Sequence, residues 1–269
     1  MATPDLPKEF IVFAGRLADA AAKETLPLFR SGAQVFNKAG IWFDPVTDAD
    51  REAERAQRRL INAMYPKHGI VGEEFGMEND DAEWRWVLDP VDGTRAFVCG
   101  IASWATLIGL EQNGQPVLGV IEQPFTGERW VGVGETLTYS HRGKSQPKTS
   151  SGITELSKAR LSTTDPRRNA YFSKVEWEAF GEIAGNAQVA RFSLDAYSYA
   201  LLAIGELDLV IESGLKHHDY AALLPVIEAG GGVVSNWKGD AVGTDDRGRI
   251  VAAATPELHD QALKVLKQV

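Results

Sequence analysis

Two aspartates, Asp89 and Asp92, come directly after the apolar run 86–88 and directly before a Gly-Thr pair at 93–94. The apolar run indicates the end of a buried strand, and Pro90 is expected to stop it in a turn. Such a turn lets both carboxylates point at one place, where they can hold a hard cation, while its free N–H groups can hold a phosphate. The alternative is a plain Asp-Pro and Asp-Gly turn that only closes a strand.

The residues after this pair are typical of a helix start. Asp92 is expected to be the capping residue, and Gly93 leaves the backbone open so that amides point outward. The segment 97–100 is predicted to be a strand, in which Cys99 packs as a small apolar group.

Two further acidic candidates lie upstream. Thr47 or Asp48 is expected to cap a helix that runs to about Tyr65, which puts Asp50 in its first turn as a capping residue. The Arg/Glu-rich stretch that follows is interpreted as a solvated helix face. Glu73 follows a short predicted strand; since it adjoins a second glutamate, at most one of the two should face a given site. A surface loop is the alternative for that acidic pair.

The C-terminal half supplies Glu212, at the end of a predicted strand, and Asp219, at the start of a predicted helix. If Asp219 meets the upstream carboxylates, they cannot all stay ionised without cations. Oxygen ligands without thiolates favour Mg²⁺, or Mn²⁺, over zinc, and two or three such ions are a standard device for phosphoryl hydrolysis. Because Mg²⁺ prefers oxygen, His217 and His218 are assigned to substrate contact or packing rather than to the metal.

The elements that must position these residues indicate two parts. Residues 1–150 are predicted to form an N-terminal α+β domain: a helix over 7–30, a short strand at 41–43, and a mostly antiparallel meander with a hairpin turn at Asn113-Gly114. Residues 151–269 alternate strands and helices, which predicts a smaller α/β domain that supplies Asp219 and substrate contacts. The polar segment 140–152 is the expected connection.

Composition narrows the partners of this 269-residue chain. Its net charge of −9 and pI near 5.1 disfavour nucleic acid, although bound cations would still admit a small phosphorylated substrate. No apolar run reaches the roughly 18 residues of a membrane span, and no leader pattern opens the chain, so no membrane partner and a cytoplasmic location are expected.

Three motifs together resemble the inositol monophosphatase superfamily: Val-Gly-Glu-Glu at 71–74, Trp-Val-Leu-Asp-Pro-Val-Asp-Gly-Thr at 86–94, and Asp219 followed by Ala-Ala and a later Glu-Ala-Gly-Gly. The resemblance runs from Phe10 to about Leu266. It implies a layered α-β-α-β-α sandwich, a Mg²⁺-dependent and Li⁺-sensitive phosphomonoesterase, and a homodimer.

The resemblance also implies residue roles. The carboxylates of the metal site would be Glu73, Asp89, Asp92 and Asp219, joined by the backbone carbonyl of Val91. Glu73, Asp50 and Thr94 would act in catalysis, the last two by orienting the attacking water. The amides of Gly93 and Thr94 would hold the phosphate, and Glu212 would bind substrate hydroxyl or amine groups.

Two stretches point to the histidinol-phosphatase branch of that family. After Gly-Thr the motif continues as Arg-Ala-Phe, whereas inositol phosphatases usually have any residue followed by Asn-Phe. Arg191 and Asp195 lie in a Tyr-containing stretch that is typical of the branch. Arg191, Asp195 and Glu212 are therefore expected to contact the substrate, and histidinol phosphate is preferred because the two carboxylates suit a cationic amino-alcohol. Inositol monophosphate is the alternative substrate. A non-catalytic, protein-binding regulator is the alternative of another class.

Overall fold

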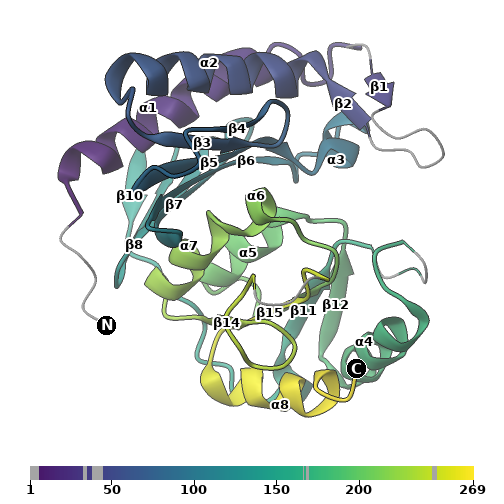
Figure 1. Ribbon diagram of the computed structural model, residues 1–269. Coiled ribbons are helices and arrows are strands. Elements are labelled where there is room, and N and C mark those ends of the chain that lie inside the picture. Colours follow the sequence, from purple (N-terminus) through teal and green to yellow (C-terminus); the bar gives the residue numbers. More distant parts are fainter. Residues whose placement is uncertain (1–5, 33–34, 38–44, 166, 168–169, 244–246) are drawn as a thin grey trace.

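Helices and sheets alternate in five layers in the computed structural model, which describes residues 6–32, 35–37, 45–165, 167, 170–243 and 247–269. From top to bottom of Figure 1, the layers are α1 with α2, a large sheet, α5 to α7, a small sheet, and α4 with α8. This arrangement confirms the predicted layered sandwich. Of the helices in these ranges, none combines the length and apolar character needed to cross a bilayer.

The helices follow the expected order along the chain. Their bounds are α1 Lys8–Thr25, α2 Asp48–Met64, α3 Thr94–Val98, the 3₁₀ turn η1 Leu156–Lys158, α4 Lys174–Asn186, α5 Ala196–Ala203, α6 His217–Tyr220, α7 Leu223–Ala229 and α8 Pro256–Leu266.

The large sheet has eight strands. In spatial order they are β10 Lys144–Gln146, β9 Thr136–His141, β8 Glu128–Val133, β7 Gln115–Gln123, β6 Ala105–Gln112, β5 Trp84–Asp92, β3 Gly69–Gly72 and β4 Gly76–Glu78. All neighbours are antiparallel except β3 and β5, which run parallel. The predicted meander and its hairpin turn at Asn113-Gly114 are confirmed; both turn residues have positive φ, as such a turn requires.

The small sheet has five strands. In spatial order they are β12 Val189–Phe192, β11 Arg160–Thr163, β13 Leu209–Glu212, β15 Ile250–Ala253 and β14 Val233–Ser235. A separate pair joins β1 Val35–Asn37 to β2 Pro45–Thr47. The chain passes from the large sheet to the small sheet after β10, so part of the expected connection over 140–152 is strand. The division at residue 150 stays a prediction.

The expectation that Pro90 ends its strand is wrong. Strand β5 continues to Asp92, with a register shift: Asp89 faces Leu107 while Asp92 faces Ala105. An advance of three residues on β5 is thus paired with an advance of only two residues on β6. Residues three apart on a regular strand point to opposite faces, whereas one extra residue in a bulge turns them to the same side.

Three predictions near this bulge are also wrong. Gly93, with φ +79°, takes the cap position of α3, and the side chain of Asp92 does not cap that helix. The segment 97–100 begins inside α3 and is not a strand. Cys99, the residue directly after α3, is exposed and does not pack as a small apolar group.

Helix α2 buries more charge than its sequence indicates. Thr47 is the N-cap, as predicted, but Glu54, Gln57 and Arg58 on the Arg/Glu-rich stretch are buried, so that stretch is not one solvated face. The strand expected at 41–43 lies outside the described residues.

Helix α7 rests directly on the large sheet. A Cβ on Gly119 of β7 would lie 2.0 Å from the carbonyl oxygen of Ala222, and one on Gly132 of β8 would lie 2.3 Å from that of Pro225. One hydrophobic cluster accordingly includes residues of both sheets and of the helices between them. The stretch 217–229 forms two helices, α6 and α7, because Pro225 is tolerated in the first turn of α7 but would not be in the interior of one long helix.

Candidate active site

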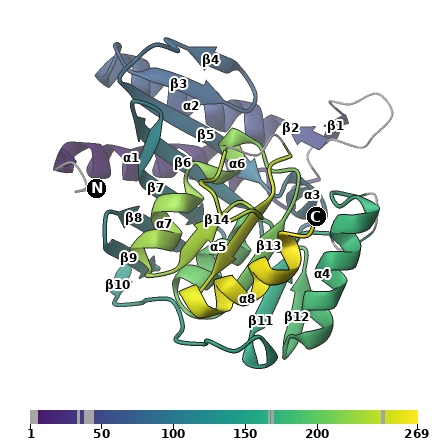
Figure 2. The ribbon, with the colours of Figure 1, turned by 60° about the horizontal axis from the view of Figure 1, so that its bottom comes forward.

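A cavity of about 350 Å³ lies where the bulge of β5 faces helices α5 and α6. Figure 2 shows the two sheets on either side of these helices. Nine of the predicted site residues line the cavity: Glu73, Asp89, Val91, Asp92, Gly93, Thr94, Asp195, Glu212 and Asp219. They come from segments that are far apart in sequence, so the tertiary fold assembles this site.

The remaining two predicted site residues lie elsewhere. Asp50 is buried behind the cavity wall and reaches it through Thr94. Arg191 is exposed on β12, is not among the residues that line the cavity, and its guanidinium donates to the carbonyl of Ala190. The guanidinium that does line the cavity belongs to Arg95, at the second position of α3.

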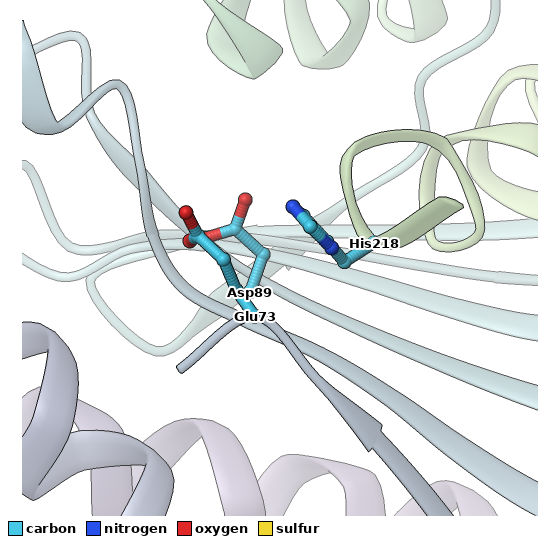
Figure 3. A group of neighbouring side chains, drawn as sticks. All are labelled: Glu73, Asp89 and His218. Atoms are coloured by element: carbon cyan, nitrogen blue, oxygen red, sulfur yellow. The ribbon is translucent and has the colours of Figure 1, made fainter. Parts of the chain in front are cut away.

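Two overlapping groups of side chains could each hold a cation. One oxygen from each of Asp89, Asp92 and Asp219 lies within 4.8 Å of the others, and the same is true of ligand atoms of Glu73, Asp89 and His218. Figure 3 shows the second group, with one ring nitrogen of His218 turned toward the two carboxylates. Asp89 belongs to both groups, so its carboxylate is placed to bridge two positions.

The electrostatics of the carboxylates fit bound cations. Burial, and then repulsion from Glu73 and Asp92, raise the pKa of Asp89 well above its ordinary value. Burial raises the pKa of Asp92 in the same way, followed by repulsion from Asp195 and Asp219. The charged form of each carboxylate is therefore unfavourable by itself, and a divalent cation among them would remove the repulsion. Oxygen donors of this kind fit Mg²⁺.

Asp50 and Thr94 form a hydrogen-bonded pair at the cavity wall. The hydroxyl of Thr94 lies 3.4 Å from Oδ1 of Asp50 and 3.0 Å from the carbonyl oxygen of Val91. Burial raises the pKa of Asp50 to about 6, against the lowering effect of its hydrogen bonds from Thr47. A carboxylate with a pKa near neutrality is suited to accept a proton through the threonine hydroxyl.

Asp195 and Glu212 form a further acidic wall of the cavity, and a Cβ on Gly93 would lie 3.0 Å from Oδ2 of Asp195. Burial raises the pKa of Asp195 to about 6, although Arg95 opposes the rise. Burial raises the pKa of Glu212 to about 8, although the Thr164 hydroxyl and amide donate to it at 2.9 and 2.7 Å. Asp92 is linked to this wall because its Oδ1 accepts from the amide of Ala196 at 2.7 Å. A cationic group in the cavity would favour the charged form of both acids.

Several residues that line the cavity were not predicted from the sequence. Tyr171 and Tyr199 line the cavity, and the buried hydroxyl of Tyr199 has no hydrogen-bond partner among the described residues. The Arg95 guanidinium lies 5.4 Å from the centre of the Tyr171 ring. Only the tyrosine-rich stretch around Tyr199 was a signal in the sequence; Tyr171 lies in a segment without a motif.

The two neighbouring histidines have different surroundings. Nε2 of His217 lies 2.5 Å from Glu111 on β6, so this ring ties α6 to the sheet. His218 instead lines the cavity, and its Nε2 lies 3.4 Å from Oδ1 of Asp219. Of the two roles expected for this pair, substrate contact and packing, His217 therefore has the packing role.

A buried clamp holds the hairpin that carries Glu73. The carboxylate of Glu54 accepts from the amides of Glu74 and Phe75 at 2.7 and 3.2 Å, and from Arg58 at 2.7 Å. A Cβ on Gly72 would come within 1.9 Å of this carboxylate, which explains the glycine. The charged face of α2 is thus buried because it anchors the hairpin.

Comparisons with known proteins agree with this site. Residues 7–269 match the profile described as the inositol monophosphatase family. A bifunctional phosphatase IMPL2 of Arabidopsis thaliana is 38% identical over 96% of this chain and 75% of its own, and a histidinol-phosphatase of Chlorobaculum parvum is 33% identical over 93% and 92%. The structure of an inositol monophosphatase from Zymomonas mobilis superimposes with a TM-score of 0.84 at 39% identity, over 97% and 98% of the chains.

The chain belongs to the inositol monophosphatase family, a family of phosphatases. The family resemblance in the sequence is thereby confirmed, as is the fold that it implies.

Proposed function

We propose that the protein is a Mg²⁺-dependent phosphomonoesterase of small metabolites, with histidinol phosphate as its substrate. The observation that supports the activity is the meeting of Glu73, Asp89, Asp92 and Asp219 around one cavity. When bound there, two or three Mg²⁺ ions would supply a positive field for the phosphate oxygens and the leaving group, and Li⁺ is expected to inhibit. Val91 lines the cavity, and its backbone carbonyl is proposed as a further ligand.

The chain's own residues orient the reactants. Asp50 accepts the proton that passes from the attacking water through the Thr94 hydroxyl, because its raised pKa makes it a fair base near neutral pH. Gly93 and Thr94 line the cavity beside the bulge, and their amides hold the phosphate oxygens. Glu73 stands beside Asp50 and Asp89 and helps to fix the water in line with phosphorus.

The substrate assignment is supported by the wall that Asp195 and Glu212 form. Asp195 and Glu212 would become charged beside an amine or imidazolium, and Tyr171 and Tyr199, which line the same cavity, are aromatic groups that suit a cation. Relatives named histidinol-phosphatase, at 33% and 32% identity, favour the same substrate. Inositol phosphates offer only neutral hydroxyls to this wall.

Phosphate release from a panel of metabolite monoesters, measured with Mg²⁺ and with EDTA, tests both the phosphatase activity and the choice of substrate. We expect release only with Mg²⁺, and a kcat/KM for histidinol phosphate at least about tenfold above that for inositol 1-phosphate. Faster turnover of the inositol ester would overturn the substrate, and no release from any ester would overturn the activity.

An Asp195→Asn variant sharpens the comparison. It keeps the shape of the wall and removes one charge, so it should lose kcat/KM for histidinol phosphate and change little on inositol 1-phosphate. Arg191→Gln is the matched control, because that exposed side chain lies outside the cavity lining. Equal losses on both esters would argue against a cation-binding role for Asp195.

We further infer a homodimer in the cytoplasm. Exposed Ile101, Phe125 and Phe192 lie on adjoining segments, since Ser103 donates to the carbonyl of Ser193 at 3.1 Å and Gln123 donates to that of Ala102 at 3.2 Å. An apolar surface of this kind suits a second copy. Light scattering should give a dimer mass for the parent and a monomer mass for Ile101→Asp.

A further inference from the structure

We propose that His218 makes one of the two metal positions a mixed nitrogen–oxygen site, which selects Mn²⁺ over Mg²⁺. The proposed ligands of this site are Glu73, Asp89 and His218, whereas the other position has the oxygens of Asp89, Asp92 and Asp219. The inference rests on the proposed metal-dependent function, and it adds that the two positions differ in chemistry.

The geometry of the mixed group suits one ion. Its three ligand atoms lie within 4.8 Å of one another. Around an ion with bonds of about 2.0–2.2 Å, ligand atoms on opposite sides are up to about 4.4 Å apart, so side-chain adjustments of a few tenths of an ångström suffice. The ring of His218 already turns a nitrogen toward the carboxylates in Figure 3.

The three side chains sit on supported backbone. Asp89 lies inside β5, in the middle of the large sheet. Glu73 follows β3 directly, and its amide donates to the carbonyl of Leu88 at 3.2 Å. His218 lies on α6, which the neighbouring His217 ties to Glu111. Preformed ligands of this kind lose little freedom when an ion binds.

The surroundings of His218 favour a ligand role over packing. Its side chain is only 14% exposed and lies among the carboxylates of the cavity. His217, one residue earlier, is paired with Glu111 and does not line the cavity, so only one of the two rings can reach a metal.

The choice of metal follows from ligand type. Mg²⁺ is a hard cation that gains little from imidazole, whereas Mn²⁺ accepts nitrogen as well as oxygen ligands. The position formed by Asp89, Asp92 and Asp219 has only oxygen ligands, so it has no nitrogen ligand that would favour Mn²⁺ over Mg²⁺. The expected state at mixed metal supply is therefore one Mn²⁺ at the His218 position and one Mg²⁺ at the Asp92 position, bridged by Asp89.

Pulsed electron paramagnetic resonance on the full-length protein, loaded with one equivalent of Mn²⁺ in excess Mg²⁺, tests the nitrogen ligand directly. We expect a ¹⁴N coupling in the parent and in His217→Asn, and none in His218→Asn. Should His218→Asn fold poorly by circular dichroism, His218→Phe keeps an aromatic ring of similar size without nitrogen and should give the same result.

Calorimetric titration supplies a second measurement. His218→Asn should weaken Mn²⁺ binding about 10–100-fold while Mg²⁺ affinity changes by about twofold or less. The absence of ¹⁴N coupling in the parent, its persistence in both His218 variants, or equal losses for the two metals would each overturn the proposal. If phosphate is still released with Mg²⁺, the proposed function stands without the mixed site; if no metal supports release, the function itself fails.

Discussion

Asp50 uses its two carboxylate oxygens for different tasks. Oδ2 accepts from the amide and hydroxyl of Thr47 at 2.8 and 2.6 Å, which completes a capping box at the start of α2. Oδ1 is left to face the Thr94 hydroxyl. The sequence presented capping and catalysis as alternatives, but the geometry allows both, because the cap holds the side chain in the orientation that the second oxygen needs.

Asp92→Asn tests the metal role of a single carboxylate. The substitution removes one charge from a buried acidic group, so Mg²⁺ affinity should fall at least about tenfold and the rate at least about 100-fold. In EDTA the same variant should melt at a higher temperature than the parent, because burial and repulsion from Asp195 and Asp219 disfavour the charge on Asp92. Calorimetric titration with Mg²⁺ measures the first effect.

Asp80→Asn is the control for this variant, since Asp80 pairs with Arg85 on the exposed surface. Its Mg²⁺ affinity should equal that of the parent. Unchanged Mg²⁺ binding by Asp92→Asn would contradict the ligand role.

Glu212 should make the metal-free protein less stable at high pH. Its pKa is raised from 4.5 to about 8 by burial, so the folded state keeps a proton that the unfolded state releases between these values. Stability is then complete below about pH 4.5 and is lost as pH rises through about 8. Glu212→Gln has no such proton, so its melting temperature relative to the parent should rise between pH 5 and pH 8.

Thermal melts of both proteins in EDTA measure this difference, with roughly 2–4 °C expected for each kcal/mol. Glu206→Gln, a substitution of the same kind on the exposed turn before β13, is the control. A constant difference from pH 5 to 8 would mean that Glu212 is ionised in the folded state.

At the scale of elements, the hairpin of β3 and β4 depends on α2. All three residues of β4 are exposed, so this strand gains little from apolar burial, whereas β3 buries Ile70 in the core. The position of β4 is fixed by the Glu54–Arg58 clamp, in which Glu54 accepts from the amide of Glu74 and Arg58 donates to the carbonyl of Gly76 at 2.5 Å. The clamp thereby sets the place of Glu73, although neither of its residues enters the cavity.

Glu54→Gln should weaken metal binding from a distance. Glutamine has one acceptor oxygen where the carboxylate serves two amides and a guanidinium, so unfolding stability should fall by about 1–3 kcal/mol. We also expect the Mg²⁺ concentration for half-maximal activity to rise several-fold, with kcat at saturating Mg²⁺ nearly kept. Activity measured against Mg²⁺ concentration separates this from a purely structural role.

The matched control is Glu52→Gln, which lies two residues earlier on the same helix. Glu52 pairs with Arg55 in solvent, and such pairs contribute little. A loss of stability in Glu54→Gln without any change in the Mg²⁺ curve would show that the clamp does not position Glu73.

At the scale of the whole molecule, the site exists because α6 and α7 are held against the large sheet. Gly109, Gly119 and Gly132 let the backbone of this helical segment approach the strands directly. The same segment carries Asp219, so the spacing between the layers sets the distance from Asp219 to Asp89 and Asp92. Layer packing and metal binding are thus coupled.

Gly119→Ala should disturb both together. The new methyl would meet the carbonyl of Ala222, which belongs to the backbone and cannot turn aside, so the helix must move. We expect a loss of about 1–3 kcal/mol in unfolding stability and a weaker Mg²⁺ affinity. Denaturant unfolding and Mg²⁺ titration measure the two effects.

Gly185→Ala on α4 serves as the control, since its Cβ would meet no atom within 4 Å and alanine favours a helix. It should be as stable as the parent or about 0.5–1 kcal/mol more stable, with unchanged Mg²⁺ affinity. Parental Mg²⁺ affinity in a folded Gly119→Ala would show that the layer spacing does not control the site.

The sequence by itself determined the local elements and the identity of most cavity residues. The Thr47 cap, the Asn113-Gly114 hairpin and the alternating strands depend on near neighbours, so their patterns predicted them. The motifs at 71–74 and 86–94 carried the family resemblance and contain six of the residues that line the cavity; Asp195, Glu212 and Asp219 came from the C-terminal half.

Only the tertiary structure decided which residues of similar type have which surroundings. Pairing with β6 creates the bulge that brings Asp89 and Asp92 to one side, although the sequence suggested a chain stopped by Pro90. Packing of α6 on Glu111 separates His217 from His218, and the position of α3 puts Arg95 rather than Arg191 at the cavity. These outcomes depend on contacts between distant segments, and no local pattern of residues records such contacts.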